Sequence, residues 1–161
     1  MSARVLVVDD IEQNRKLLTD KLKNEYFHVI TAVDGEDAIE RALAEEPDVI
    51  LMDINMPGIG GIEATRRIRD AYPDMRVLMV TMLEDDSVFA AMRAGARGYV
   101  LKGAEPAEVL RAIRAVADGD AIFSPGIAER LIHYFSHPPA ARGLAGTPAD
   151  RRFPELSERE V

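Results

Sequence analysis

The sequence predicts an α/β domain built on a parallel β-sheet with helices on both faces. Short runs rich in Val, Ile and Leu alternate strictly with amphipathic helical patterns, and five such strand–helix units follow one another. The runs are apolar at almost every position, which is typical of strands buried on both faces of a parallel sheet. Hydrophobic residues make up 47% of the 161 residues, enough for a substantial core. We therefore predict a doubly wound five-stranded sheet, followed by a C-terminal helix and a linker.

The strand predictions rest on β-branched and other apolar runs bounded by polar or turn-forming residues. The first run, RVLVV, starts almost at the N-terminus, and the third, DVILMD, ends abruptly in a carboxylate. Each run is long enough for a strand and too short for a helix. The five predicted strands are Arg4–Val8, His28–Ala32, Asp48–Asp53, Arg76–Thr81 and Gly98–Lys102.

Helical patterns fill the intervals between these strands. In the first of them, Ile11, Leu18 and Leu22 are spaced to lie on one side of the helix. Pro106 begins the fifth helix at its first position, where a missing N–H costs nothing. The predicted helices are Ile11–Asn24, Gly35–Ala44, Gly61–Tyr72, Glu84–Ala94 and a fifth from Pro106 to about Gly119.

The last quarter of the chain changes character. Ser124 as N-cap and Pro125 at the first helical position predict a sixth helix. The stretch from 138 to 155 is rich in Pro, Gly and Ala, which predicts a flexible linker. Ser157 and Glu160 in LSEREV form a capping box and indicate the start of a further helix. We expect a globular domain at 1–120, an additional helix at 121–137, the linker at 138–155 and the start of another domain at 156–161.

Composition excludes several classes of function. The net charge is −8, which argues against nucleic-acid or membrane binding, because phosphate contacts need clustered Lys and Arg. The absence of cysteine excludes disulfides, thiol catalysis and cysteine-based metal sites. The N-terminus does not have the pattern of a signal peptide, and no apolar run reaches about 18 residues. We expect a soluble, cytoplasmic protein.

Polar side chains stand at the carboxyl ends of four predicted strands. Asp9 and Asp10 follow the first strand, Asp53 ends the third, Thr81 the fourth and Lys102 the fifth. Functional groups gather at this edge of open parallel sheets. If these strands are neighbours, all five side chains face one pocket.

Three carboxylates in one pocket repel one another, at about 4 kcal/mol per pair for ~4 Å and an effective dielectric near 20. Lys102 offsets part of this repulsion, and a divalent cation would offset more. Oxygen ligands favour a hard ion, which points to Mg²⁺. A carboxylate beside Mg²⁺, a hydroxyl and an ammonium suits phosphoryl transfer, with Asp53 as the attacking nucleophile.

The segments VVDD, LMDINMPGIGGIEA, VTM and GYVLK occur in order at the expected strand ends. With them the chain from Arg4 to about Gly119 resembles the receiver domain of bacterial two-component response regulators. The resemblance implies a flavodoxin-like strand order, 2-1-3-4-5. It also implies that Asp53 is the phosphoacceptor and that Asp10 and Asp53 bind Mg²⁺ directly.

In the same resemblance Asp9 acts on the ion mainly through water, and Asn55 supplies its backbone carbonyl. Lys102 matches the lysine that contacts the phosphoryl group, and Thr81 and Tyr99 match the switch pair that remodels a surface on phosphorylation. A sensor histidine kinase is the implied donor, and a homodimer on phosphorylation is the implied response. The implied chemistry is limited to self-phosphotransfer and slow autodephosphorylation.

The segments GYVLKGA and LSEREV resemble the NarL/FixJ group, whose output is a LuxR-type helix-turn-helix domain that controls transcription. LSEREV resembles the opening of that domain, so we expect no specific DNA binding by this chain, although a full-length protein would bind DNA. Residues from Val5 to about Ala44 resemble receivers of cyclic-dinucleotide synthases instead. We therefore hypothesise a chimera of two receivers, with ordinary divergence as the alternative.

Three other functions are weighed against the receiver. An aspartate-nucleophile phosphohydrolase needs a second Asp two residues after the nucleophile, where Asn55 stands. A flavodoxin-type electron carrier needs a phosphate-binding loop after the first strand, and VVDDIEQN has no glycine. A dimerising scaffold that does not use phosphorylation would have no need of the polar constellation. The fifth helix and residues 131–135 are the candidate partner surfaces.

Overall fold

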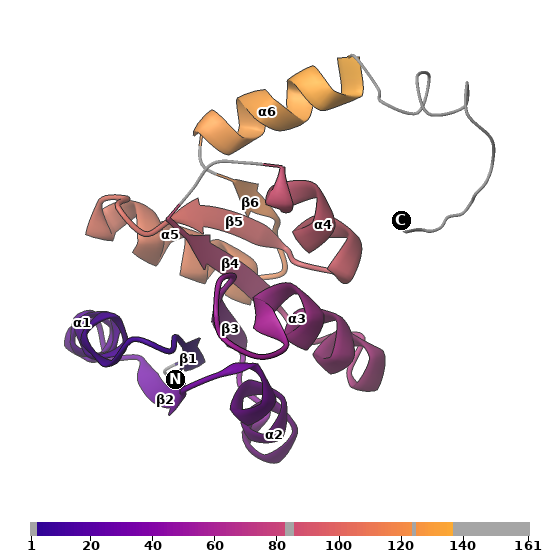
Figure 1. Ribbon diagram of the computed structural model, residues 1–161. Helices are drawn as coiled ribbons and strands as arrows, with labels where there is room; N and C mark the ends of the chain where they lie inside the picture. The colour runs from indigo at the N-terminus through magenta and orange to yellow at the C-terminus, as the bar shows by residue number, and fades with distance from the viewer. Residues whose placement is uncertain (1–2, 83–85, 124, 137–161) are drawn as a thin grey trace. The chain divides into compact units, whose positions relative to one another are not determined.

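The computed structural model describes residues 3–82, 86–123 and 125–136, and the chain divides into two compact units, 1–127 and 128–161. The first unit holds a six-stranded parallel sheet in the order β2-β1-β3-β4-β5-β6 (Figure 1). The order of the first five strands is therefore the one that the resemblance implied. The strands are β1 (Arg4–Val8), β2 (His28–Ala32), β3 (Val49–Asp53), β4 (Val77–Thr81), β5 (Gly98–Leu101) and β6 (Ile122–Phe123).

The five predicted strands are confirmed, and the structure adds a short sixth strand at the edge of the sheet. β6 has only two residues and pairs with β5, with Gly98 opposite Ile122 and Tyr99 opposite Phe123. A two-residue strand shows no periodicity, so no pattern in the sequence could reveal it. It extends the sheet beyond residue 120, where we placed the end of the globular domain.

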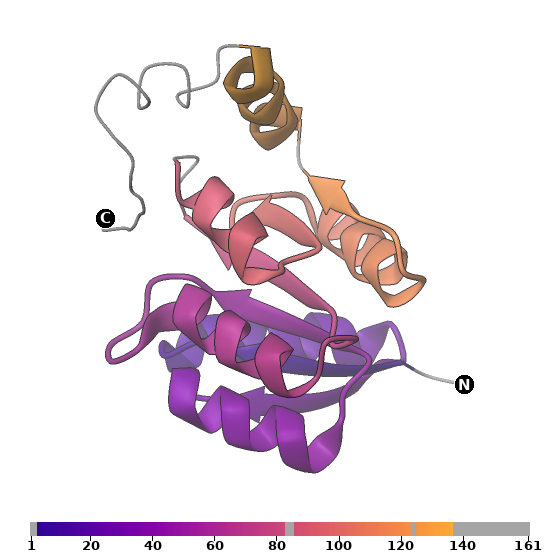
Figure 2. The same cartoon turned by 90° about the vertical axis from the view of Figure 1, so that its right-hand side faces the viewer.

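Helices cover both faces of the sheet, as the strict strand–helix alternation predicts. α1 and α5 lie on one face, and α2, α3 and α4 lie on the other (Figures 1 and 2). α6 follows β6, as the pair Ser124 and Pro125 predicted, and no helix in the described parts of the chain is long and apolar enough to cross a membrane. The helices are α1 (Glu12–Asn24), α2 (Gly35–Glu45), α3 (Gly60–Ala71), α4 (Ser87–Ala94), α5 (Pro106–Ala117) and α6 (Pro125–Ser136).

The core forms where the central strands meet the helices. Every residue of β3 and β4 is buried, because these strands have neighbours on both sides and helices on both faces. On the face of α1 and α5, Val5, Leu51 and Val80 pack with Ile113 and Val116 of α5 in one apolar cluster. The uninterrupted apolar runs in the sequence thus reflect burial on two faces.

Some boundaries differ from the prediction. Ile11 does not lie inside the helix: it is the N-cap of α1 in an extended conformation, and the residue is 49% exposed. α4 begins at Ser87, and residues 83–85 of the predicted helix lie outside the described residues. The predicted linker and the segment 156–161 also lie outside them, so those predictions stay predictions.

A close approach at Gly61 places α3 directly against the end of β3. A Cβ at this position would lie 2.0 Å from the backbone carbonyl oxygen of Asp53, and the Gly61 N–H donates to the carbonyl of Ile54 at 2.9 Å. Only glycine fits here, because the obstructing atom belongs to the backbone and cannot move aside. The glycine thereby fixes the position of the strand end that carries Asp53.

Gly61→Ala is expected to lower the free energy of unfolding by about 2–4 kcal/mol, because overpacking against rigid backbone displaces the strand end or the helix. Chemical denaturation measures the loss. Gly103→Ala is the matched control, since a Cβ there meets nothing within 4 Å, and it should leave stability within about 0.5 kcal/mol. Equal stability of the two variants would contradict the steric argument.

Candidate functional site

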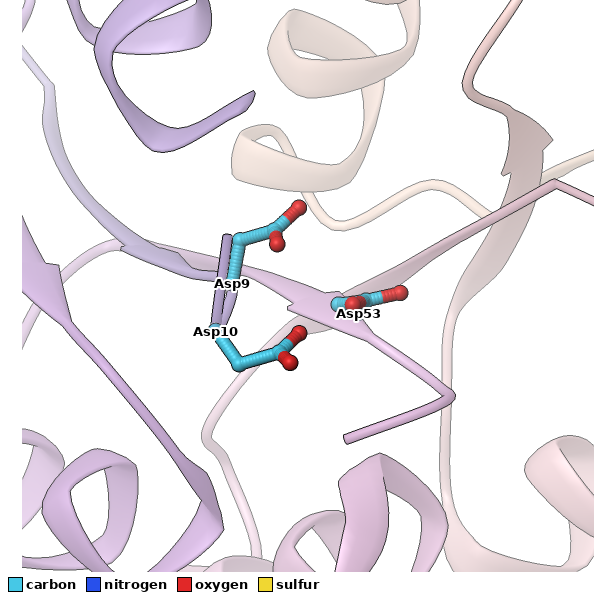
Figure 3. A group of neighbouring side chains, drawn as sticks. All are labelled: Asp9, Asp10 and Asp53. Atoms are coloured by element: carbon cyan, nitrogen blue, oxygen red, sulfur yellow. The ribbon is translucent and has the colours of Figure 1, made fainter. Parts of the chain in front are cut away.

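The carboxyl ends of β1 and β3 bring three aspartates together. These strands pair in register with Val8 opposite Met52, so that Asp9 and Asp53 follow side by side. Carboxylate oxygens of Asp9, Asp10 and Asp53 lie within 4.8 Å of one another (Figure 3). Asp9 and Asp53 are buried, and Asp10 is the most exposed of the three. The predicted acidic cluster is confirmed.

Lys102 reaches this cluster from the other side of β4. It follows β5 by one residue, and its Nζ lies 2.9 Å from Asp9 Oδ2 and 3.4 Å from Asp53 Oδ1. The Lys102 side chain is only 14% exposed, so both ion pairs are screened little by water. Burial lowers the pKa of Lys102, but the hydrogen bonds and charges of Asp9 and Asp53 outweigh it and hold that pKa above its usual value. Lys102 is therefore a fixed positive charge at the site.

Asp9 is the most firmly oriented of the carboxylates. Its Oδ1 accepts a hydrogen bond from the Ile11 N–H at 2.9 Å, while its Oδ2 faces Lys102. The Arg15 guanidinium donates to the Asp9 backbone carbonyl at 2.7 Å. Asp9 thus closes the turn into α1 and also anchors Lys102. Because both carboxylate oxygens of Asp9 already have partners, Asp9 is better suited to contact a metal ion through water than to bind it directly.

The negative charge of the Asp53 carboxylate is unfavourable at this buried, acidic position. Burial is the largest influence and raises its pKa, Lys102 opposes the rise, and the charges of Asp9 and Asp10 add to it. The balance raises the pKa of Asp53 from an ordinary value of 3.8 to about 6. An added positive charge near Asp53 would therefore stabilise its ionised form.

The donor set fits a hard divalent cation. Three carboxylates face one ammonium, so two negative charges stay uncompensated when all four groups are ionised. The ligand atoms are all oxygens, which is the preference of Mg²⁺ and Ca²⁺. A divalent cation between Asp10 and Asp53 would restore neutrality without displacing Lys102.

The remaining predicted residues are Thr81, Asn55 and Tyr99, and they differ in burial and in their distance from the carboxylates. Thr81 ends β4 and is 1% exposed, and its carbonyl accepts from the Lys102 N–H at 2.7 Å. Asn55 is exposed two residues after Asp53. Tyr99 does not reach the carboxylates: its ring is fully buried, and its hydroxyl lies 2.7 Å from Ser87 Oγ.

Nothing in the sequence singles out Ser87, which lies inside the predicted helix Glu84–Ala94. Its partner Tyr99 is 12 residues away on a strand, so no local spacing relates the two. A buried tyrosine hydroxyl does require a partner, but the sequence does not say which one.

A second concavity shows that volume alone does not locate the site. A space of about 580 Å³ opens at the amino ends of the strands, lined among others by Ala3, Tyr26 and Arg114. It shares no residue with the acidic cluster. A smaller space of about 100 Å³ touches Asp9 and Lys102 directly. The convergence of charged groups, not size, distinguishes the carboxyl edge.

Solved structures and curated sequences agree on the relatives of this chain. A two-component response regulator of the LuxR family from Aurantimonas sp. SI85-9A1 superposes with a TM-score of 0.80 at 34% identity, covering 85% of this chain and 100% of that one. The signal receiver domain of the putative response regulator NarL from Mycobacterium tuberculosis gives a TM-score of 0.69 at 31% identity, covering 73% and 98%.

Among curated sequences, the response regulator GacA of Pseudomonas aeruginosa is 42% identical over 161 residues, covering 98% of this chain and 72% of GacA. The response regulator UvrY of Escherichia coli O157:H7 is 38% identical over 162 residues, covering 98% and 70%. The chimera hypothesis stays a hypothesis, since these alignments run along nearly the whole chain without comparing its halves. The model of the response regulator receiver domain matches residues 5–114, and the chain belongs to this family of signalling proteins.

Proposed function

We propose that Asp53 accepts a phosphoryl group from a phosphohistidine of a sensor kinase, in a reaction that depends on Mg²⁺. A carboxylate oxygen of Asp53 attacks phosphorus, a P–O bond forms, and the P–N bond to the donor histidine breaks. The electron pair of that bond returns to the imidazole, which takes a proton from solvent. The observation that carries this proposal is the buried Asp53 carboxylate, held 3.4 Å from Lys102 beside two further aspartates.

Each neighbouring group has a proposed part in the transfer. Lys102 stabilises the negative charge on the transferred group, and Thr81 donates a hydrogen bond to one of its oxygens. Asp10, Asp53 and the Asn55 carbonyl would hold Mg²⁺, with Asp9 acting through water; the ion supplies charge neutralisation for the incoming phosphoryl group. Asp9 keeps Lys102 in place during the reaction.

The phosphohydrolase alternative lacks its general acid. Two residues after Asp53, the chain offers the Asn55 amide, which has no proton to give at neutral pH. The scaffold alternative gives no reason to bury three carboxylates and a lysine at one sheet edge. Both alternatives are therefore less well supported than the phosphoacceptor.

Incubation with acetyl phosphate and Mg²⁺ is expected to add one phosphoryl group to the chain, because the pocket itself supplies the nucleophile and the stabilising charges. Intact-mass spectrometry detects the addition. Asp53→Asn, which keeps the size of the side chain but removes the nucleophile, should show none, and neither should the native chain with a chelator. Asp20→Asn, on the exposed side of α1, is the matched control and should react as the native chain does. A phosphoryl group on the Asp53→Asn variant would contradict the assignment.

The raised pKa of Asp53 predicts a pH-dependent stability. A folded-state pKa of about 6 lies above the ordinary 3.8, so the folded protein binds this proton more tightly than the unfolded chain does. The stability from this group is present below about pH 4 and is lost as the pH rises to about 6.

In Mg²⁺-free buffer, Asp53→Asn should therefore raise the free energy of unfolding at pH 8 by about 1–3 kcal/mol and change it little at pH 4. Denaturation series at both pH values measure the difference. Added Mg²⁺ should reduce the gain at pH 8, because the ion stabilises the native carboxylate. The same gain at pH 4 and pH 8 would show that charge burial is not its cause.

Phosphorylation is expected to increase the mass of the particle in solution toward that of a dimer. The candidate surfaces are α5 and the segment 131–135, where the side chains of Tyr134 and Phe135 lie outside the described set. Light scattering before and after activation measures the change. An unchanged mass at every concentration tested would contradict the proposed dimer.

A further inference from the structure

The turn that follows β1 carries two of the three aspartates of the acidic cluster. Asp9 and Asp10 are consecutive residues, and both of their carboxylates point toward Asp53 (Figure 3). Asp10 is the more exposed of the two, and among the described residues no donor contacts its carboxylate. The direction of the Asp10 side chain is therefore set by the backbone that carries it.

Hydrogen bonds hold the backbone of this turn from both sides. The Asp9 N–H donates to the Ala32 carbonyl at 3.3 Å, and the Ile11 N–H donates to Asp9 Oδ1 at 2.9 Å. A side chain of α1 adds a further bond, because the Arg15 guanidinium donates to the Asp9 backbone carbonyl at 2.7 Å. This bond is the shortest of the three and has a charged donor, which makes it stronger than a bond between neutral groups.

The Asp9 carbonyl belongs to the peptide unit that joins Asp9 to Asp10. A peptide unit is planar and rigid, so a fixed carbonyl direction also fixes where the chain continues to the Asp10 Cα. Arg15 is itself anchored in the first turns of α1, where its N–H donates to the Ile11 carbonyl at 3.0 Å. Arg15 can therefore orient Asp10 through the backbone without touching its carboxylate.

We propose that Arg15 is a positioning residue for the divalent cation: by holding the Asp9 carbonyl, it keeps the Asp10 carboxylate directed toward Asp53. The inference rests on the proposed function, which gives Mg²⁺ to Asp10 and Asp53. It assigns to Arg15 no contact with the ion. Gly61 fixes the end of β3 that carries Asp53, and Arg15 does the same for the turn that carries Asp10.

The charge of Arg15 by itself would have the opposite effect on the ion. A guanidinium close to the acidic cluster repels a cation, so its removal would tighten Mg²⁺ binding if charge were its only influence. Loss of the hydrogen bond would weaken Mg²⁺ binding, because a smaller fraction of molecules has Asp10 in the binding direction and the apparent affinity falls by that fraction. The sign of the change therefore separates the two roles.

A Mg²⁺ titration of the full chain, followed by the NMR signals of its backbone amides, tests the inference without any phosphoryl group. Arg15→Met removes the donor and keeps most of the aliphatic stem, and it should weaken the Mg²⁺ affinity roughly three- to tenfold. Arg15→Lys keeps a charged donor and should recover part of this loss. Unchanged or tighter binding in Arg15→Met, or no recovery in Arg15→Lys, would overturn the inference.

Lys16→Met is the matched control for the lost charge. Lys16 is the next residue of α1 and is exposed, so this variant removes one positive charge without removing a hydrogen bond to the turn. Its Mg²⁺ affinity should equal that of the native chain or be slightly higher. The same weakening in Lys16→Met as in Arg15→Met would contradict the role of the hydrogen bond.

A double-mutant cycle separates positioning of Asp10 from general loosening of the fold. Asp10→Asn should weaken Mg²⁺ binding by itself, and it is titrated over a wider range of Mg²⁺ concentration. If Arg15 acts through Asp10, adding Arg15→Met to Asp10→Asn should cost clearly less than it costs in the native chain. Losses that add in full would show that Arg15 acts elsewhere. Thermal unfolding in a chelator sets a temperature at which every variant is folded.

The outcomes distinguish this inference from the proposed function. If the native chain and Arg15→Met bind Mg²⁺ equally well, the role of Arg15 is refuted while the role of Asp53 stands. If Arg15→Met weakens Mg²⁺ binding but the native chain gains no phosphoryl group from acetyl phosphate, the role of Arg15 stands and the proposed phosphoacceptor fails. A native chain that binds no Mg²⁺ would refute both the proposed metal site and the inference.

Discussion

The contact of Lys102 with Asp9 and Asp53 is the interaction on which the rest of this molecule depends. It spans four consecutive strands of the sheet, because Asp9 follows β1, Asp53 ends β3 and Lys102 follows β5 on the far side of β4. The contact exists only if the strands adopt the order β1-β3-β4-β5 with the observed register. Packing also fixes the end of β3 at Gly61, where α3 approaches the Asp53 backbone too closely for any side chain.

The acidic site carries negative charge that the protein itself does not fully compensate. One ammonium cannot neutralise three carboxylates, and burial makes the deficit costly, as the raised pKa of Asp53 shows. This uncompensated charge favours the binding of a cation, and the proposed phosphoryl transfer would use a divalent cation to supply that positive charge.

β5 lies between the acidic pocket and the start of α4 along the chain of contacts that the structure describes. β5 carries Lys102 at its end and Tyr99 in its middle, and α4 begins at Ser87 on the other end of the Tyr99 hydrogen bond. Lys102 therefore lies three residues along the chain from Tyr99, whose hydroxyl contacts the first residue of α4. The related proteins GacA and UvrY are response regulators.

The sequence by itself determined the strand–helix alternation, the five main strands and the carboxyl-edge residues, because apolar runs and terminal charges are local properties of the chain. It was wrong about Ile11, which caps α1 in solvent, and silent about β6, because two residues carry no period. Only the tertiary structure decided the pairings: Asp9 and Asp53 with Lys102, Ser87 with Tyr99, and Gly61 against the Asp53 backbone. Each joins residues from different elements, and such contacts are fixed by how the elements pack and not by any spacing along the chain.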